Sequence, residues 1–202
     1  IKANKDLHRE TAARLFEKSP EEVTDEERQI GKTANFQLLF GTGVEEFQKK
    51  LNHSTGQEFS LSKAKKLMKA FLKAYPDIAA WQDRIEKETR KAGQKGIQVN
   101  NLSGKKIFTR EYNQALNYAI AGSEAEIMKS AATYFGTECR DRGINAQIIN
   151  MVHDSMVVET AFEDKEVAVG LLKEAVEYSM DRTLINFRTQ VTIDTLAESP
   201  IV

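Results

Sequence analysis

The 202-residue chain is 41% hydrophobic and has a formal net charge of −1, a composition typical of a folded domain rather than a disordered segment. It has no run of about 18 apolar residues and no apolar leader, so the sequence predicts no membrane span, no secretory signal and a cytoplasmic location. The single cysteine, Cys139, excludes an internal disulfide and a zinc site built from cysteines.

The first hundred residues are predicted to be mainly helical. Thr24 and Glu27 have the spacing of a capping box at the start of a helix, and Gly41 and Gly43 are expected to end that helix. Two further helices are predicted, the first of which begins near Ser60 or Ser62 and ends before Pro76, because proline disfavours helix in the residue ahead of it. The second runs through Trp81 to about Lys91.

The second half is expected to combine helices with short strands. The expected elements are a hairpin or looped connector over 93–108, a helix over 110–142 ending at Gly143, a β-hairpin of 146–152 and 156–160 around residues 153–155, a helix over 163–186 and a strand over 189–194. A helical first half and a helix-covered antiparallel sheet in the second define an α+β fold.

A stripe of four side chains recurs every four residues in the first predicted helix: Arg28, Lys32, Phe36 and Phe40. Each step advances about 6 Å and turns about 400°, so the stripe lies on one face over about 18 Å. Two cations followed by two aromatic rings suit a ligand with a polyanionic tail and a flat ring system, as in a nucleoside triphosphate. Periodicity alone leaves open the ordinary alternative of a solvated face beside core aromatics.

This stripe, which a glycine follows, resembles motif B of the family A DNA polymerases, the bacterial polymerase I family. Other segments are similar to that family in the same order along the chain, and residues 151–155 are similar to its motif C. The other matching segments are 6–12, 71–76, 80–81 and 117–129. The resemblance implies a helical fingers subdomain over 1–108 and the C-terminal part of a palm subdomain over 109–202, with a β-hairpin and a C-terminal strand packed on helices.

The resemblance also implies a binding site for an incoming deoxynucleoside triphosphate (dNTP). Arg28 and Lys32 match positions that hold the triphosphate, where arginine offers a fork of donors and lysine a compact charge, and Lys32 is also a candidate catalytic residue. His8 matches a family histidine that contributes from a neighbouring helix, with a capping or core histidine as the alternative. Phe36 matches the position beside the sugar, which implies discrimination against dideoxynucleotides. Phe40 matches a tyrosine that stacks near the template base.

Asp154, at the tip of the predicted hairpin, is the candidate metal ligand and a candidate catalytic residue. In motif C the matching aspartate is one of two that hold a pair of Mg²⁺ ions, whereas an isolated aspartate in a turn is mostly a turn former. His153 is expected to contact the primer strand, and Gly41 and Asn117 are further candidate DNA contacts. For Asn117, packing or simple solvent exposure is an almost equal alternative.

The sequence also departs from the family pattern. It has no Asp-x-Ser-x-x-Glu segment, the motif A that carries the other catalytic aspartate, and it begins with Ile1. Ser155, Ala121 and Asn113 replace the expected glutamate, glutamine and arginine, which is compatible with a divergent, phage-like branch or a degenerate copy. We therefore expect an artificial or processed fragment of a larger polymerase, inactive alone.

The function expected from these observations is template-directed DNA synthesis, with primer-template DNA, dNTP, Mg²⁺ and the missing palm and thumb as partners and cofactor. Two alternatives remain: a natural stand-alone subunit of a split polymerase, and a catalytically inactive module that binds nucleic acid or nucleotide. A single-subunit RNA polymerase also uses an Arg, Lys, Tyr-Gly helix, but Phe36 argues against that class.

Overall fold

The computed structural model describes residues 5–184 and 191–194. The chain forms two compact units. We call the first the helical unit, which consists of residues 2–100 and 106–119, and the second the C-terminal unit, which consists chiefly of residues 101–105 and 120–202. None of the helices in the described ranges is long and apolar enough to cross a bilayer.

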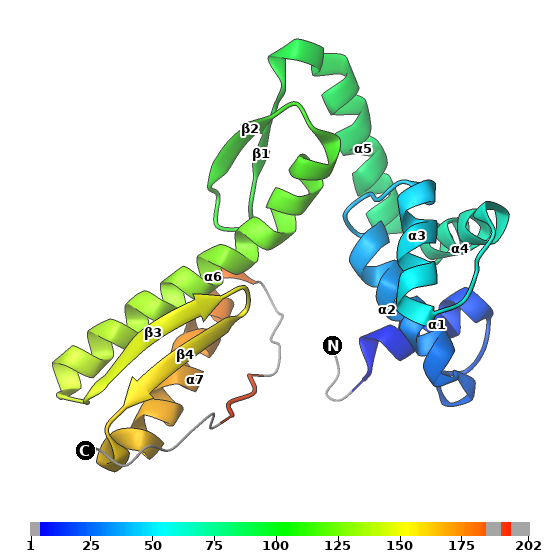
Figure 1. Cartoon of the computed structure of the whole chain (residues 1–202). Helices are drawn as coiled ribbons and strands as arrows, with labels where there is room; N and C mark the ends of the chain where they lie inside the picture. Colours follow the sequence, from blue (N-terminus) through cyan, green and yellow to red (C-terminus); the bar gives the residue numbers. More distant parts are fainter. Residues whose placement is uncertain (1–4, 185–190, 195–202) are drawn as a thin grey trace. The chain divides into compact units, whose positions relative to one another are not determined.

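The helical unit begins with short helices (Figure 1), several of which pack around a shared apolar core. Its elements are α1 (Leu7–Phe16), the 3₁₀ turn η1 (Pro20–Glu22), α2 (Asp25–Leu38), α3 (Val44–Thr55), α4 (Leu61–Ala74), α5 (Pro76–Ala92) and a second 3₁₀ turn, η2 (Gly93–Lys95). Phe47 and Phe71, from α3 and α4, are fully buried and fill the centre of this core with Leu51. Helix α3 was not predicted from the sequence.

The helical unit continues with an antiparallel hairpin and the start of a long helix. Strands β1 (Ile97–Asn100) and β2 (Lys106–Thr109) pair from Ile97 opposite Thr109 to Asn100 opposite Lys106, which confirms the predicted hairpin. Helix α6 (Tyr112–Arg142) follows at once, and Leu116 on it is buried against Ile85 of α5 and Val99 of β1.

The predicted start of α2 is confirmed in detail. The Thr24 side chain accepts a hydrogen bond from the Glu27 amide at 3.2 Å, and the Glu27 carboxylate accepts one from the Thr24 amide at 3.0 Å. This reciprocal capping box satisfies two of the amides that a helix start leaves without partners.

The predicted end of α2 is also confirmed. Gly41 has a left-handed φ of 70°, its amide donates to the Leu38 carbonyl, and the next amide, of Thr42, donates to the Gln37 carbonyl. These two bonds form a Schellman motif, which favours glycine because only glycine takes a positive φ without steric cost. Phe40 therefore lies just beyond the helix, so the expectation that all four side chains of the stripe project from helical residues is wrong for this one.

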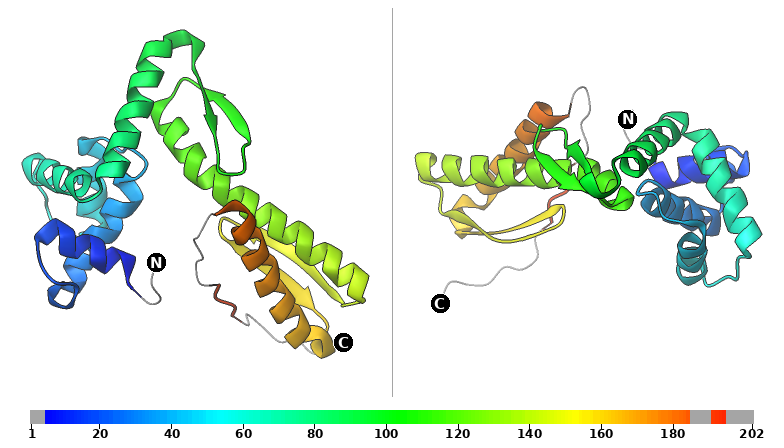
Figure 2. Two further views of the ribbon diagram at one scale, coloured as in Figure 1. Left: turned by 180° about the vertical axis from the view of Figure 1, so that it is seen from behind. Right: turned by 90° about the horizontal axis from the view of Figure 1, so that it is seen from above.

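The C-terminal unit is a β-hairpin with two helices on the same face (Figure 2). Strands β3 (Ala146–Val152) and β4 (Ser155–Thr160) are antiparallel, and a short η3 turn (Phe162–Asp164) leads into α7 (Lys165–Thr183). Phe135 of α6 and Leu171 of α7 are buried against the covered face of the hairpin. The two hairpins with their helices confirm the predicted α+β class.

Two expectations of the sequence have different outcomes. The strand expected over 189–194 lies partly outside the described residues, and the described part, 191–194, has no regular secondary structure, so a strand there is not borne out. The expected boundary between 108 and 109 separates subdomains by function rather than by compactness, and it stays a prediction.

Gly31 permits a very close approach of α1 and α2. A Cβ atom added at Gly31 would lie 2.4 Å from the His8 carbonyl oxygen and 2.9 Å from the Ala12 amide nitrogen. Because both contacts are with backbone atoms, no side-chain rotation can relieve them. The first turns of α1 are therefore held directly against α2.

We expect Gly31→Ala to lower the free energy of unfolding by about 2 kcal/mol, since overpacking a tight contact costs about 1–3 kcal/mol. Trp81 is the single tryptophan of the chain and lies in the helical unit, so its fluorescence during urea unfolding measures the change.

Gly170→Ala is the matched control, because a Cβ on Gly170 of α7 would meet nothing within 4 Å. Alanine there should stabilise α7 by about 0.5–1 kcal/mol and leave the Trp81 transition unchanged. If Gly31→Ala unfolded at the wild-type urea concentration, the proposed close approach of α1 and α2 would be wrong.

Candidate functional site

Asp6 joins the start of α1 to α2. Its Oδ1 atom caps α1 by accepting hydrogen bonds from the amides of His8 at 3.0 Å and Arg9 at 3.1 Å. Its Oδ2 atom accepts a bond from Nε of Arg28 on α2 at 2.5 Å. The bond from Arg28, aided by the two backbone bonds, holds the pKa of the Asp6 carboxyl below its usual value despite partial burial. The terminal guanidinium nitrogens of Arg28 are left outside this ion pair.

His8 lies beside the stripe on α2, as the sequence predicted. Its ring centroid is 5.7 Å from that of Phe36, and its Nδ1 atom is 3.1 Å from the side-chain nitrogen of Asn35. Burial, together with the positive charges of Arg28 and Lys32, lowers the pKa of His8, while the Asp6 carboxylate opposes this shift. The imidazole is therefore biased toward its neutral form.

Lys32 lies one helical turn after Arg28 and is exposed. Within the described residues no ion pair involves Lys32, so its ammonium group is available to an anion. The exposed fraction of Phe36, one turn further along, is 53%, which is high for a large apolar ring. The order predicted from the stripe, two cations followed by an exposed ring, is thus present from Arg28 to Phe36.

A groove of about 470 Å³ brings together three of the predicted residues: Phe36, Phe40 and Asn117. The first two come from the end of α2 and the turn after it, and Asn117 comes from the first turns of α6. Within this groove the side-chain nitrogen of Asn113 donates hydrogen bonds to the carbonyls of Phe40 at 2.8 Å and Gly41 at 3.0 Å. Asn113 therefore fixes the turn that carries Phe40.

Gly41, a predicted DNA contact, has a clear packing role. A Cβ atom at this position would lie 2.6 Å from a ring carbon of Tyr112 and 2.7 Å from a methyl carbon of Leu116. Any larger residue would thus push the α2 turn away from α6, besides straining the left-handed backbone. Contact with DNA at Gly41 stays a prediction.

The tip of the β3–β4 hairpin carries His153 and Asp154 as a two-residue turn between paired Val152 and Ser155. His153 has a φ of 51°, a left-handed conformation that costs a non-glycine residue about 1 kcal/mol. Strain of this kind is concentrated at functional sites. Ile149 is an extra, unpaired residue that forms a bulge in β3, another feature common beside active sites.

Asp154, the candidate Mg²⁺ ligand, stands apart from other possible ligands in the part of the chain that the structure describes. The carboxylate is exposed, and its Oδ1 atom accepts a 3.4 Å bond from the hydroxyl of neighbouring Ser155. Among the residues that the structure describes, no three His, Cys, Asp or Glu side chains gather closely enough to hold a metal ion. Mg²⁺ prefers several oxygen ligands, so Asp154 fits only as one ligand of a site completed by other groups.

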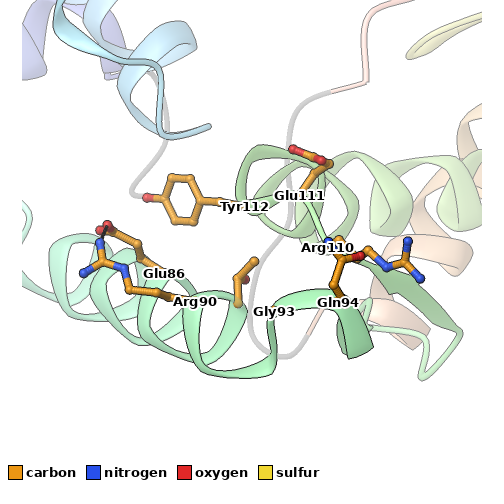
Figure 3. A pocket seen from close by; sticks show the side chains of 8 residues that line it. Glu86, Arg90, Gly93, Gln94, Arg110, Glu111 and Tyr112 are labelled. Carbon is orange, nitrogen blue, oxygen red and sulfur yellow. Dashed lines mark hydrogen bonds and ion pairs between the residues drawn. The ribbon is translucent and has the colours of Figure 1, made fainter.

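A second groove, of about 650 Å³, contains none of the predicted site residues. Figure 3 shows its lining, from the end of α5 and from the segment that leads into α6. Arg90 is paired with Glu86 at 2.5 Å, and Arg110 and Glu111 add one charge of each sign. Such balanced charges select no particular ligand, and we assign this groove no function.

Sequence reasoning missed three residues of the site. Asp6 was only part of a matching segment, although its position before a helical run is a usual signal for a helix cap. Asn113 was noted as a departure from the family, but its bonds to the α2 turn depend on tertiary structure. Asn35 gave no signal at all, because its partner on α1 is far away in sequence.

Comparisons with known proteins identify the family of this chain. A family model described as DNA polymerase family A matches residues 1–197. DNA polymerase I of Aquifex aeolicus (strain VF5) is 35% identical over 180 residues, which is 89% of this chain and 30% of that protein. The thermostable DNA polymerase I of Thermus thermophilus is 27% identical over 187 residues, 86% of this chain and 21% of that protein.

The POL domain of Pol1 from M. smegmatis, solved in complex with DNA primer-template and dNTP, is similar to this structure with a TM-score of 0.71 at 22% identity. The similarity covers 87% of this chain and 31% of that one, so the fold is that of part of a polymerase domain. Since the family match extends over nearly the whole sequence, this chain belongs to DNA polymerase family A. It spans about 30% of the length of the A. aeolicus relative.

We expect Asp6→Asn to lower the free energy of unfolding by about 0.5 kcal/mol near neutral pH, because asparagine keeps the cap but loses a partly exposed ion pair. A carboxyl whose pKa is lowered by folding stabilises the protein above its unfolded pKa, near 3.8, and this stabilisation is lost as the pH falls through the folded pKa. The difference between wild type and variant should therefore vanish in acid.

Urea unfolding at several pH values measures this difference. Asp25→Asn is the matched control, because Asp25 pairs with Arg9 but its side chain is 95% exposed, and its loss should change nothing measurable. A difference for Asp6→Asn that persisted at low pH would contradict the role of the Asp6 carboxylate.

Proposed function

We propose that this chain is the part of a family A DNA polymerase that binds the incoming dNTP and contributes one metal-binding carboxylate to template-directed DNA synthesis. The observation that carries the proposal is the joint between α1 and α2, where His8 lies beside Phe36 with their ring centroids 5.7 Å apart and the charges of Arg28 and Lys32 close by. Cations and exposed rings in that order match the phosphates, sugar and base of a nucleotide.

The chemistry needs little more from these residues than position and charge, because phosphoryl transfer depends mainly on orientation and electrostatic stabilisation. Arg28 and Lys32 neutralise the triphosphate, and Lys32 stabilises the negative charge that develops on the leaving pyrophosphate. The ring of Phe36 packs against the sugar. Held by the Asp6 carboxylate at its Nε atom, Arg28 keeps its terminal nitrogens directed to a phosphate at low entropic cost.

The groove next to this joint contacts the template and primer. Phe40, whose carbonyl accepts a hydrogen bond from Asn113, supplies an aromatic face for a base, and Asn117 supplies a polar group in the same groove. The loss of the tyrosine hydroxyl at Phe40 removes one hydrogen bond from this surface and keeps the stacking. At the hairpin tip His153 contacts the primer backbone.

Asp154 contributes one ligand to a Mg²⁺ pair that other parts of the polymerase complete. When bound, the metal ions activate the primer 3′-OH and neutralise the leaving group. Exposed apolar side chains along β3 support a missing neighbour: Ile149, Met151 and Val152 are 56%, 40% and 51% exposed. Apolar side chains on a two-stranded hairpin ordinarily pack against another element.

The proposal predicts activity in a chimera in which residues 1–197 replace the matching segment of A. aeolicus DNA polymerase I. Primer extension with Mg²⁺ and dNTPs should proceed, and Asp154→Ala should reduce its rate at least about a hundredfold, because metal-ion stabilisation is worth several kcal/mol. The chain without those other parts should not extend a primer.

Asp141→Asn, an exposed aspartate near the end of α6, is the control and should leave the rate unchanged. A folded chimera without activity, beside an active A. aeolicus parent, would contradict the proposal and favour an inactive binding module. Activity of the 202-residue chain alone would show that it needs no other carboxylate donor. If a separate natural protein, added in place of the rest of the A. aeolicus enzyme, made the 202-residue chain active, the chain would be a subunit of a split polymerase.

The chimera also tests the assignment of Phe36 to the sugar position. Because a phenylalanine offers no hydroxyl to replace a missing 3′-OH, the enzyme should discriminate strongly against dideoxynucleotides. Phe36→Tyr should raise their incorporation relative to dNTPs by roughly tenfold, the value of one hydrogen bond. Phe40→Tyr adds the same hydroxyl elsewhere in the groove and should not change that ratio; an equal effect of both changes would refute the assignment.

A further inference from the structure

A line of polar side chains runs behind His8 and away from the stripe. The side-chain nitrogen of Asn35 lies 3.1 Å from His8 Nδ1, and the side-chain oxygen of Asn35, Oδ1, lies 3.0 Å from the hydroxyl of Thr11. That hydroxyl is in turn 2.6 Å from the hydroxyl of Tyr75, at the end of α4. Thr11 is fully buried, so its hydroxyl has to find its partners within the protein.

The donors and acceptors in this line all run in one direction. Thr11 has one hydroxyl proton and donates it to Oδ1 of the Asn35 side chain. The short contact with Tyr75 therefore requires Tyr75 to donate to Thr11. The amide nitrogen of Asn35 can only donate, so it donates to His8. Nδ1 of His8 is then an acceptor, and in a neutral ring the proton must be on Nε2.

We propose that Asn35, supported by Thr11 and Tyr75, is a positioning residue that fixes His8 as the Nε2–H tautomer, so that the ring presents a hydrogen-bond donor to a phosphate of the nucleotide. The ligand in this inference rests on the proposed function; the tautomer does not. Within residues 5–184 and 191–194 no hydrogen bond to Nε2 of His8 is present. A neutral donor there binds a phosphate oxygen without adding a further charge beside Arg28 and Lys32.

The surroundings of the ring support a neutral His8. Asp6 at the start of α1 favours the protonated ring, while burial and the cations Arg28 and Lys32 on α2 disfavour it more strongly, and together they lower its pKa. Tyr75, at the end of α4, connects to the ring through Thr11 and Asn35, and the guanidinium of Arg14 lies 5.0 Å from the centre of the Tyr75 ring.

Phe36 fixes the other side of the imidazole. Its ring is tilted by 45° to that of His8 at a centroid distance of 5.7 Å, within the range of favourable aromatic contacts. With Asn35 bonded to Nδ1 and Phe36 against the ring, two adjacent residues of α2 determine both the tautomer and the orientation of His8. A side chain set in this way loses little entropy when it binds a phosphate.

Nitrogen-15 NMR of the histidine rings in the 202-residue chain tests the proposal, because ring nitrogens with and without a proton have well-separated shifts. The chain has three histidines, and His8→Gln identifies the His8 signals. Above its pKa, His8 should be present as one tautomer with the proton on Nε2. A proton on Nδ1, which would mean that the whole line of donors is reversed, would overturn the proposal.

Asn35→Asp keeps the shape of the side chain and replaces the donor by a carboxylate. The proton should then move to Nδ1, and the titration of His8 should shift to higher pH, because the new charge favours the protonated ring. Gln29→Glu adds the same charge to α2 at a position about 120° around the helix from Asn35 and should leave the His8 tautomer unchanged. An unaltered tautomer in Asn35→Asp would refute the positioning role.

Addition of dATP to the same samples separates this inference from the proposed function. In the wild type the Nε2 signal should shift as nucleotide is added, while Nδ1 keeps the shift of an acceptor. If the Nε2–H tautomer is present but its signal does not respond to dATP, the nucleotide site is wrong and the role of Asn35 stands. If Nε2 responds but Asn35→Asp leaves the tautomer in place, the role of Asn35 is wrong and the nucleotide site stands.

Discussion

The close approach of α1 to α2 at Gly31 is the constraint on which the candidate nucleotide site depends. The carbonyl oxygen of His8 in α1 occupies the space where any residue other than glycine at position 31 would have its Cβ atom. The contact brings the cap residue Asp6 to Arg28 and the ring of His8 to Phe36. A glycine inside a helix costs about 1 kcal/mol relative to alanine, so its presence in α2 is explained by this packing and not by helix propensity.

The sequence predicted the parts of the fold that local chemistry determines. The capping box at Thr24, the glycine stop at Gly41, the helix that ends before Pro76 and the hairpin around Asp154 are each specified by a few adjacent residues, and all are present. The family was also identified correctly, because ordered motifs carry more information than periodicity. Helix α3 was missed, since no distinctive cap precedes it: its N-cap residue is Gly43, which has no side chain that could bond to the first turn.

The rest of the site depends on contacts between residues far apart in sequence. Asn113 stabilises a turn more than seventy positions earlier, with its side-chain nitrogen 2.8 Å from the Phe40 carbonyl. Tyr75, at the end of α4, begins a line of donors that continues through Thr11 of α1, and Asn35 of α2 directs that line to His8. A single sequence gives no signal for such pairs. The stripe, in contrast, was predicted from spacing, and only Phe40 departs from it, because the helix closes before that residue.

The central claim is that α1 and α2 together form the binding site for a nucleoside triphosphate. Titration of the ¹⁵N-labelled 202-residue chain with dATP at low salt, followed through the backbone amides, tests it most directly. We predict that the largest shifts will occur over residues 6–10 and 28–36, with Gly31 among them, and that they will weaken as salt screens the phosphates. Shifts confined to the β3–β4 hairpin, or no shifts at all, would contradict the account.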